Sequence, residues 1–196
     1  METKNKTEMN SKNNIFLIVG TILVLAISRL IPHPYNFTPL VGIAVLGATY
    51  FQSSIWKYVV PVVAFYVSDL LVTNLLYASY YPGQGFVWFT SHMVWTYGAT
   101  LAIVLISSVI MRKKSLKNLA GASFAGAVMF FLISNFGSWL VDPIYPKSIG
   151  GLMTAYVAGI PFFPATLVSA FVYAGLGYGV IEFGASRMRQ SVVGEV

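Results

Sequence analysis

The sequence contains no cysteine and few charged residues. The absence of cysteine from all 196 residues excludes disulfides, thiolate metal sites and cysteine nucleophiles. Only 9% of the residues are charged and 57% are hydrophobic, with a mean hydropathy of +0.73, whereas about 25% of the residues of a soluble domain are charged. So few charges cannot cover a water-facing surface, which excludes an ordinary soluble enzyme. The two histidines, His33 and His92, disfavour a histidine-rich metal site.

The long apolar segments indicate an integral membrane protein. A spanning helix needs roughly 17–25 predominantly apolar residues, and all the apolar segments but one have that length. The exception, 39–51, reaches only about 20 Å at ~1.5 Å per residue, short of the ~30 Å hydrocarbon core. It is therefore either a tilted short span or a re-entrant hairpin. The candidate spans are 15–31, 39–51, 56–77, 87–111, 116–141 and 159–183.

The segments outside these spans are polar. Residues 1–14 lack apolar periodicity and are predicted to form a disordered cytoplasmic tail. Residues 15–183 are then a single six-helix transmembrane domain, and residues 184–196 are a second cytoplasmic tail. One alternative stays open for the first span, because Ala26 and Ser28 resemble the small-x-small cleavage site of a signal peptide.

The basic residues predict the orientation of the spans. With six spans and the N-terminus inside, ten of the 12 basic residues lie on the inner side, as the positive-inside rule requires. If 39–51 did not cross, the basic loop at 112–117 would lie outside. The sequence thus predicts an all-α six-helix bundle with both termini cytoplasmic, and basic residues scattered in this way do not form a nucleic-acid patch. The inner residues are Lys4, Lys6, Lys12, Lys57, Arg112, Lys113, Lys114, Lys117, Arg187 and Arg189, and the outer ones are Arg29 and Lys147.

The three loops expected on the outer side share a distinctive composition. The loops 29–39, 78–85 and 142–151 are rich in proline, glycine and aromatic residues. Proline fixes φ and glycine permits tight turns, so such loops are rigid and compact. Aromatic rings with a few polar groups are typical of an organic-ligand pocket. The alternative is that proline and glycine only turn the chain while tyrosine anchors the membrane interface.

Polar residues also gather in the outer halves of four spans. Asp69 lies inside the third span, where a carboxylate is costly and is a functional candidate by default. Tyr66, Thr73 and Tyr77 share its helical face. Similar faces on the fourth, fifth and sixth spans predict a cavity that is open to the outside or capped by the outer loops. Alternatives stay open: Asp69 forms a structural ion pair with Arg29, His92 is a structural hydrogen-bonder, and serine and threonine bond within the membrane helices.

Ten residues are the candidate substrate-binding residues of this cavity. Aromatic rings would supply stacking, while Asp69, Asn135 and His92 would orient a ligand by hydrogen bonds. Arg29 or Lys147 would receive an anionic group or neutralise Asp69. No catalytic residue, metal or cofactor is predicted. The candidates are Arg29, His33 and Asn36 in the first outer loop, Tyr145 and Lys147 in the third, and Asp69, His92, Trp95, Asn135 and Trp139 in the cavity beneath.

Several sequence stretches resemble a family of uncharacterised bacterial and algal membrane proteins. They are RLIPHPYNFTP (29–39), Ser68-Asp69-Leu70, SNFGSWL (134–140), YPKSIGGL (145–152) and AGIPFFPATL (158–167). The members resemble the substrate-binding S components of energy-coupling-factor (ECF) vitamin transporters. This resemblance implies a six-helix bundle in the bacterial cytoplasmic membrane that binds a vitamin-like molecule near its outer face. It also implies a membrane-embedded coupling subunit with two ATPases as partners. The first span lacks the Ala-x-x-x-Ala pair that often docks the coupling subunit.

Uptake of a small organic molecule is therefore the primary functional hypothesis. ATP would be hydrolysed by the partners, since the sequence has no GxxxxGK[ST] loop. The alternatives are a solitary transporter or facilitator in which Asp69 carries a proton, an intramembrane enzyme that combines Ser68 and Asp69 with His92, and a purely structural membrane protein.

Overall fold

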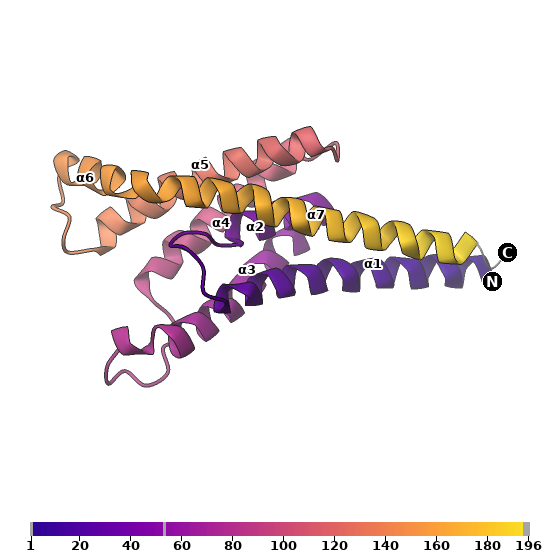
Figure 1. The fold of residues 1–196 in the computed structure, drawn as a ribbon, viewed down its shortest axis with the longest axis horizontal. Helices are drawn as coiled ribbons and strands as arrows, with labels where there is room; N and C mark the ends of the chain where they lie inside the picture. Colours follow the sequence, from indigo (N-terminus) through magenta and orange to yellow (C-terminus); the bar gives the residue numbers. More distant parts are fainter. Residues whose placement is uncertain (1, 53, 194–196) are drawn as a thin grey trace.

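Helices make up the fold. The computed structural model describes residues 2–52 and 54–193, and within these ranges it contains α-helices, short 3-10 turns, one π-helical turn and no strand. The α-helices are α1 (Glu2–Ile27), α2 (Leu40–Tyr50), α3 (Trp56–Leu71), α4 (Ser91–Ile110), α5 (Leu116–Val141), α6 (Ile149–Gly159) and α7 (Phe163–Val193) (Figure 1).

Membrane-compatible helices account for most of the chain. Four helical segments of the described residues are long and apolar enough to cross a bilayer, and two further apolar helices are shorter. An all-helical, membrane-compatible fold is thus confirmed, while the six-span topology stays a prediction. The four long segments are Trp56–Leu76, Ser91–Ile110, Leu116–Val141 and Ile149–Met188, and the two shorter ones are Asn14–Leu30 and Leu40–Tyr50.

The helical ends differ from the expected boundaries. Helix α1 begins at Glu2, inside the segment 1–14 that was expected to be a disordered tail, and α7 continues beyond residue 183 to Val193. Helices α1 and α7 run side by side, so the start of the first helix and the end of the last lie together (Figure 1).

The last helical segment begins about ten residues earlier than the sequence predicts. Ser148 caps α6 by accepting a hydrogen bond from the Gly151 backbone N–H at 3.2 Å. A short 3-10 turn then leads directly into α7. Pro161 lies in that turn and Pro164 is the second residue of α7. Proline needs no backbone N–H partner in the first turn of a helix, so both prolines are accommodated without ending the helical segment.

Helix α2 forms the centre of the bundle. Every residue from 40 to 49 is buried, and α1, α3, α4, α5 and α7 all pack against it. Its 11 residues span only about 16 Å at ~1.5 Å per residue. Just beyond its C-terminal end, Gln52 Nε2 donates a hydrogen bond to the Met111 carbonyl at 2.5 Å. The helix therefore connects the loop 31–39 with the turn between α4 and α5.

Two glycines allow the neighbouring helices to approach α2 closely. A Cβ at Gly42 would lie 2.7 Å from Tyr173 Cβ and 2.8 Å from the Ala174 backbone nitrogen. A Cβ at Gly47 would clash with the Pro61 ring and lie 2.9 Å from the Lys57 carbonyl oxygen. Most of these neighbouring atoms are backbone or ring atoms that cannot rotate away, so glycine is required where α7 and α3 cross α2.

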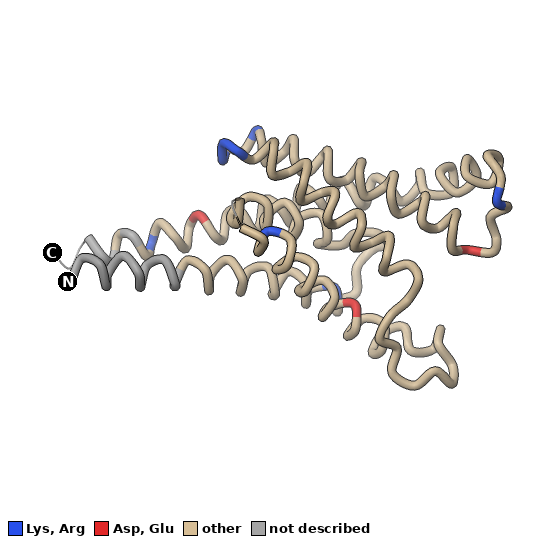
Figure 2. The backbone as a smooth tube through the Cα atoms, turned by 180° about the vertical axis from the view of Figure 1, so that it is seen from behind, with Lys and Arg blue, Asp and Glu red and all other residues tan. Residues whose placement is uncertain are grey.

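Charged residues distinguish the two ends of the bundle. Figure 2 shows several lysines and arginines toward one end of the bundle, and acidic and basic residues close together at the opposite end. We call the first end the basic end. The lysines and arginines at this end whose side chains the structure describes are Lys57, Arg112, Lys113, Lys114, Lys117 and Arg187. The loop 31–39 and the α5–α6 loop lie toward the opposite end.

Replacing Gly47 with alanine should destabilise the protein by about 1–3 kcal/mol, because the added methyl group overpacks the contact with α3. Gly175→Ala is the matched control, since a Cβ there meets no atom within 4 Å and alanine is the better helix former. Thermal unfolding of the purified protein in detergent checks both variants. Equal melting temperatures for the two would contradict the close packing around α2.

Candidate functional site

Two cavities flank the loop 31–39. The first, which we call the amide cavity, has a volume of about 310 Å³ and lies between this loop, α5, α6 and α7. The second, which we call the arginine cavity, has a volume of about 510 Å³ and lies between the same loop and the end of α3. Asn36 lines both. The amide cavity is lined by Asn36, Phe130, Phe131, Ser134, Asn135, Ser138, Tyr145, Ala158, Gly159, Phe162, Phe163 and Thr166. The arginine cavity is lined by Arg29, His33, Tyr35, Asn36, Thr38, Val72, Tyr77 and Tyr80.

The amide cavity combines aromatic rings with neutral polar groups. The rings of Phe131 and Phe163 meet edge to face with centroids 5.2 Å apart. Amide and hydroxyl groups supply the polarity, and none of the described residues that line the cavity is charged. Such a surface suits an uncharged ring that carries hydrogen-bonding groups.

Asn135 is fixed in this cavity by its own helix and by α6. Its Nδ2 donates to the Phe131 carbonyl at 2.7 Å. Gly159 lies against the amide so closely that an added Cβ would be 2.8 Å from Nδ2 and nearer still to Oδ1. Because residue 159 is a glycine, the end of α6 packs directly onto Asn135. This contact holds α5 and α6 close together beside the cavity.

Asn36 lies at the tip of a tight turn. Its φ of 60° is in the left-handed region, which asparagine adopts more readily than most residues. The Phe37 N–H donates to the Pro34 carbonyl at 3.0 Å, and the Phe37 ring packs against Tyr173 with centroids 5.6 Å apart. The turn is therefore anchored on α7, and it places Asn36 between the two cavities.

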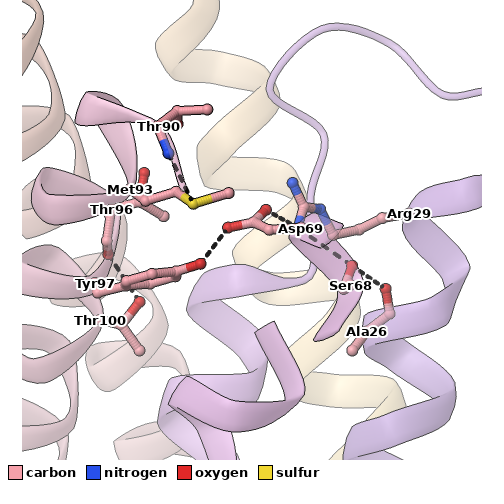
Figure 3. Close-up of polar contacts among 9 residues, drawn as sticks. All are labelled: Ala26, Arg29, Ser68, Asp69, Thr90, Met93, Thr96, Tyr97 and Thr100. Carbon is pink, nitrogen blue, oxygen red and sulfur yellow. Dashed lines mark hydrogen bonds and ion pairs between the residues drawn. The ribbon is translucent and has the colours of Figure 1, made fainter. Parts of the chain in front are cut away.

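A buried ion pair lies behind the arginine cavity. Arg29 Nη1 donates to Asp69 Oδ1 at 2.5 Å and to Ser68 Oγ at 3.2 Å. The Tyr97 hydroxyl donates to Asp69 Oδ2 at 2.9 Å, and the Ser68 hydroxyl donates to the Ala26 carbonyl at 2.8 Å. Figure 3 shows Asp69 between Arg29 on one side and Tyr97 on the other. The network joins the ends of α1 and α3 to α4.

The ion pair is shielded from solvent. The side chains of Arg29 and Asp69 are only 13% and 10% exposed, and the guanidinium group lies 4.2 Å from the centroid of the Phe65 ring. Removing one charge of a buried pair leaves the other unpaired, which is far more costly than losing a surface ion pair. The pair thus holds the end of α3 to α1.

A π-helical turn continues α3 beyond this pair. It comprises Val72–Leu76, and such turns are frequent at functional sites. Asn74 Nδ2 donates to the carbonyls of Leu70 and Val87 at 2.9 Å, and its Oδ1 accepts from the Val87 N–H at 2.8 Å. Asn74 therefore holds the segment before α4 against the end of α3. Tyr77 and Tyr80, which follow Asn74 in the sequence, line the arginine cavity.

A further cavity lies at the basic end. Its volume is about 380 Å³, and Tyr50, Lys114 and Glu182 contribute polar groups to its lining. The Tyr50 hydroxyl donates to Glu182 Oε1 at 2.8 Å, and Lys114 Nζ lies 4.3 Å from the centroid of the Tyr50 ring. The fully buried part of α2 separates this cavity from the two at the opposite end.

Similarity to a known family covers nearly the whole chain. The family of unknown function DUF6580 matches residues 9–191. The chain belongs to DUF6580. No curated protein and no solved structure matches it. Membership of an uncharacterised family is thus confirmed for this DUF6580 chain, while the likeness to ECF S components stays a proposal.

The structure distributes the ten candidate residues of the DUF6580 chain over three places. Asn36, Asn135 and Tyr145 line the amide cavity, and Arg29, His33 and again Asn36 line the arginine cavity. Asp69 lies behind the arginine cavity as the partner of Arg29. The other four, His92, Trp95, Trp139 and Lys147, make contacts around the end of α5 and line neither cavity.

These four residues hold the corner between α4, α5 and α6. His92 Nε2 lies 3.1 Å from Asp142 Oδ1, and Lys147 Nζ donates to the carbonyls of Trp139 and Asp142, the latter at 3.1 Å. Trp139 Nε1 donates to the Pro146 carbonyl at 2.9 Å. Of the three residues in the enzyme alternative, Ser68 and Asp69 share Arg29 as a partner, whereas His92 pairs with Asp142.

Trp95 packs where α4 crosses α5. Gly137 leaves room for its side chain, since a Cβ there would lie 2.5 Å from Trp95 Cβ. The Trp95 ring meets Phe136 edge to face with centroids 5.4 Å apart. Trp95 thus belongs to the contact between these two helices.

Sequence reasoning missed the hydrophobic lining of the amide cavity and the third member of the ion-pair network. The phenylalanines at 130, 131, 162 and 163 line the amide cavity, but a phenylalanine in a membrane helix has no pattern that separates a cavity wall from a lipid-facing position. Tyr97 binds Asp69 from another helix, and spacing within one helix cannot reveal such a partner. The described residues contain no group of three or more His, Cys, Asp or Glu side chains placed to hold a metal ion.

Asp69→Asn should destabilise the protein by about 3–5 kcal/mol, because it leaves the Arg29 guanidinium buried without a counter-charge. Tyr97→Phe removes one hydrogen bond from the same carboxylate and should cost only about 1 kcal/mol. The double variant Arg29→Gln/Asp69→Asn should lose less than the sum of its two single variants. Thermal unfolding in detergent measures all of these. Additive losses in the double variant would show that the two side chains are not energetically coupled.

Proposed function

We propose that this protein takes up a small organic molecule, which it binds in the amide cavity, and that it acts as a substrate-binding component of the ECF S-component type. The site binds and orients its ligand and performs no chemistry on it. The ligand is a vitamin-like or nucleobase-like compound whose ring enters the amide cavity uncharged.

The lining of the amide cavity is the observation that carries this proposal. Its volume of about 310 Å³ is at the lower end of the ~300–1,000 Å³ usual for small-molecule sites. Aromatic rings provide apolar contact, and the amides of Asn36 and Asn135 with the hydroxyl groups of Ser134, Ser138 and Tyr145 provide donors and acceptors. A few polar groups converging in an aromatic pocket are the usual means of fixing the orientation of an organic ligand.

The arrangement of charge supports an outward-facing site. We infer six spans, with the basic end and both termini in the cytoplasm of a bacterium and the two cavities toward the outside. The basic residues gather at the end far from the amide cavity (Figure 2), as the positive-inside rule requires. Helix α2 supports a crossing at 39–51, because it connects the loop 31–39 with the basic turn between α4 and α5.

Energy for uptake would come from partner subunits. The chain has no GxxxxGK[ST] phosphate-binding loop, so we propose a membrane-embedded coupling subunit with two ATPases, as the resemblance to S components implies. The lipid bilayer is the other partner.

A solitary transporter or facilitator is the second candidate, and one observation favours it. The polar cavity at the basic end, lined by Tyr50, Lys114 and Glu182, lies across α2 from the amide cavity, as the inner vestibule of a transport pathway would. Uptake that persists in cells without coupling subunits would favour this candidate. Loss of uptake in such cells would favour the S-component type.

Ala158→Phe should abolish ligand binding, because Ala158 lines the amide cavity and a phenyl group would fill it. Val157→Phe is the matched control, since Val157 is 63% exposed and lines neither cavity. Mass spectrometry of the purified protein should detect a co-purifying small molecule with wild type and Val157→Phe and not with Ala158→Phe. If no molecule accompanies wild type, and no ring-bearing vitamin or nucleobase raises its melting temperature, the proposed function is wrong.

The absence of native cysteine makes the proposed orientation directly testable. Ile144→Cys, in the α5–α6 loop at a position that is 75% exposed, should react with a membrane-impermeant maleimide in intact cells. Lys113→Cys, at the basic end, should react only after the membrane is permeabilised. The reverse pattern would place the amide cavity on the cytoplasmic side.

A further inference from the structure

We propose that the arginine cavity binds the anionic group of a small molecule, a carboxylate or a phosphate, through the Arg29 guanidinium. This site goes beyond the proposed function, which places an uncharged ring in the amide cavity.

Some of the hydrogen-bond donors of Arg29 are not used by protein groups and are available to a ligand in the arginine cavity. A guanidinium group has five N–H donors, and the hydrogen bonds of Arg29 to Asp69 and Ser68 both come from Nη1. Among the residues whose side chains the structure describes, Nη2 and Nε have no hydrogen-bond partner, and the side chain is 13% exposed and lines the cavity. Neither nitrogen is a fully buried atom, so both are open to an acceptor that enters the cavity.

The orientation of the guanidinium group is fixed from two sides. One face packs on the Phe65 ring at 4.2 Å, and the Nη1 corner is held by Asp69 and Ser68. A group held in this way is preorganised for a planar acceptor such as a carboxylate, or for a phosphate, which an arginine fork binds with two parallel hydrogen bonds.

The rest of the lining suits an anion. The described lining residues include no aspartate or glutamate, and they offer the phenols of Tyr35, Tyr77 and Tyr80, the Thr38 hydroxyl and the Asn36 amide. His33 Nδ1 lies 3.0 Å from the Pro34 carbonyl, which leaves Nε2 for the cavity. Asp69 approaches Arg29 at Nη1 and is not among the lining residues, so the anion would bind the arginine from the other side.

Lys147 is the other basic residue expected on the outer side, and its ammonium group binds protein groups outside the arginine cavity. Its ammonium group donates to the backbone carbonyls of Trp139 and Asp142, and it lines neither cavity. Of the two candidates for receiving an anionic group, the geometry therefore selects Arg29.

The anion has two plausible sources in a membrane, a soluble compound and a lipid headgroup, and the test separates them. The soluble probes are sodium acetate, inorganic phosphate and acetamide, which matches acetate in shape but is neutral; none of them carries a ring that would suit the amide cavity. The lipid probe is a nanodisc of phosphatidylcholine with or without phosphatidylglycerol. We expect acetate, phosphate or phosphatidylglycerol to raise the melting temperature of wild type, and we expect acetamide to leave it unchanged.

The decisive variant is Arg29→Lys. A lysine keeps the charge that balances Asp69 but lacks the fork, so affinity for the bound anion should fall about tenfold or more, as expected for the loss of a charge-assisted hydrogen bond. Tyr97→Phe is the matched control, because it alters the same network on the far side of Asp69 and leaves the cavity lining unchanged; its affinity should stay near that of wild type. His33→Ala, in the partly exposed loop, gives a second variant that should weaken binding even if Arg29→Lys does not fold.

The proposal is wrong if wild type responds to none of the anions, or if Arg29→Lys and His33→Ala respond as wild type does. A response to phosphatidylglycerol alone would identify a lipid headgroup as the source. The result is independent of the proposed function, because binding of a ring compound that is lost in Ala158→Phe tests the amide cavity whether or not an anion binds at Arg29.

Discussion

The complete burial of α2 is the constraint on which the rest of the structure depends. A helix that is apolar on all sides is covered by other protein or by lipid, and five other helices cover α2. Gly42 and Gly47 bring α7 and α3 within backbone contact of it. The same arrangement fixes the loop 31–39 at one end of α2 and the basic turn near the other. Both candidate cavities border that loop, so their position follows from the packing around α2.

Away from α2, polar contacts between helices add to close packing such as that of Trp95 on Gly137. The Arg29–Asp69 pair, with Ser68 and Tyr97, joins α1, α3 and α4. The contacts of His92 and Lys147 join the start of α4 to the loop between α5 and α6. These two groups of contacts hold the walls on either side of the loop 31–39. The candidate residues that line neither cavity therefore still position the helices that form the walls.

The sequence predicts the long helices well, because their apolar runs exceed the length needed to span a bilayer. It fails at the start of the last helical segment, because the predicted span begins at residue 159 whereas the helix already begins at Ile149. Pro161 and Pro164 lie inside the predicted span, and both fall in positions that tolerate them. Helix periodicity placed Asp69 on a polar face and left its pairing with Arg29 as one of several alternatives. The grouping of Phe131 with Phe163, and of Trp95 with Gly137, depends on where helices cross, and no spacing within a single helix encodes a crossing point.

Asn36 belongs to the walls of both cavities at the tip of a single left-handed turn. A ligand that shifted this turn on one side would alter the shape of the other side as well. Thermodynamic linkage makes any such influence mutual: the factor by which one occupant changes the affinity of the second equals the factor by which the second changes the first. If two molecules, or two parts of one molecule, occupied the two cavities, Asn36 is the residue through which their binding would be coupled.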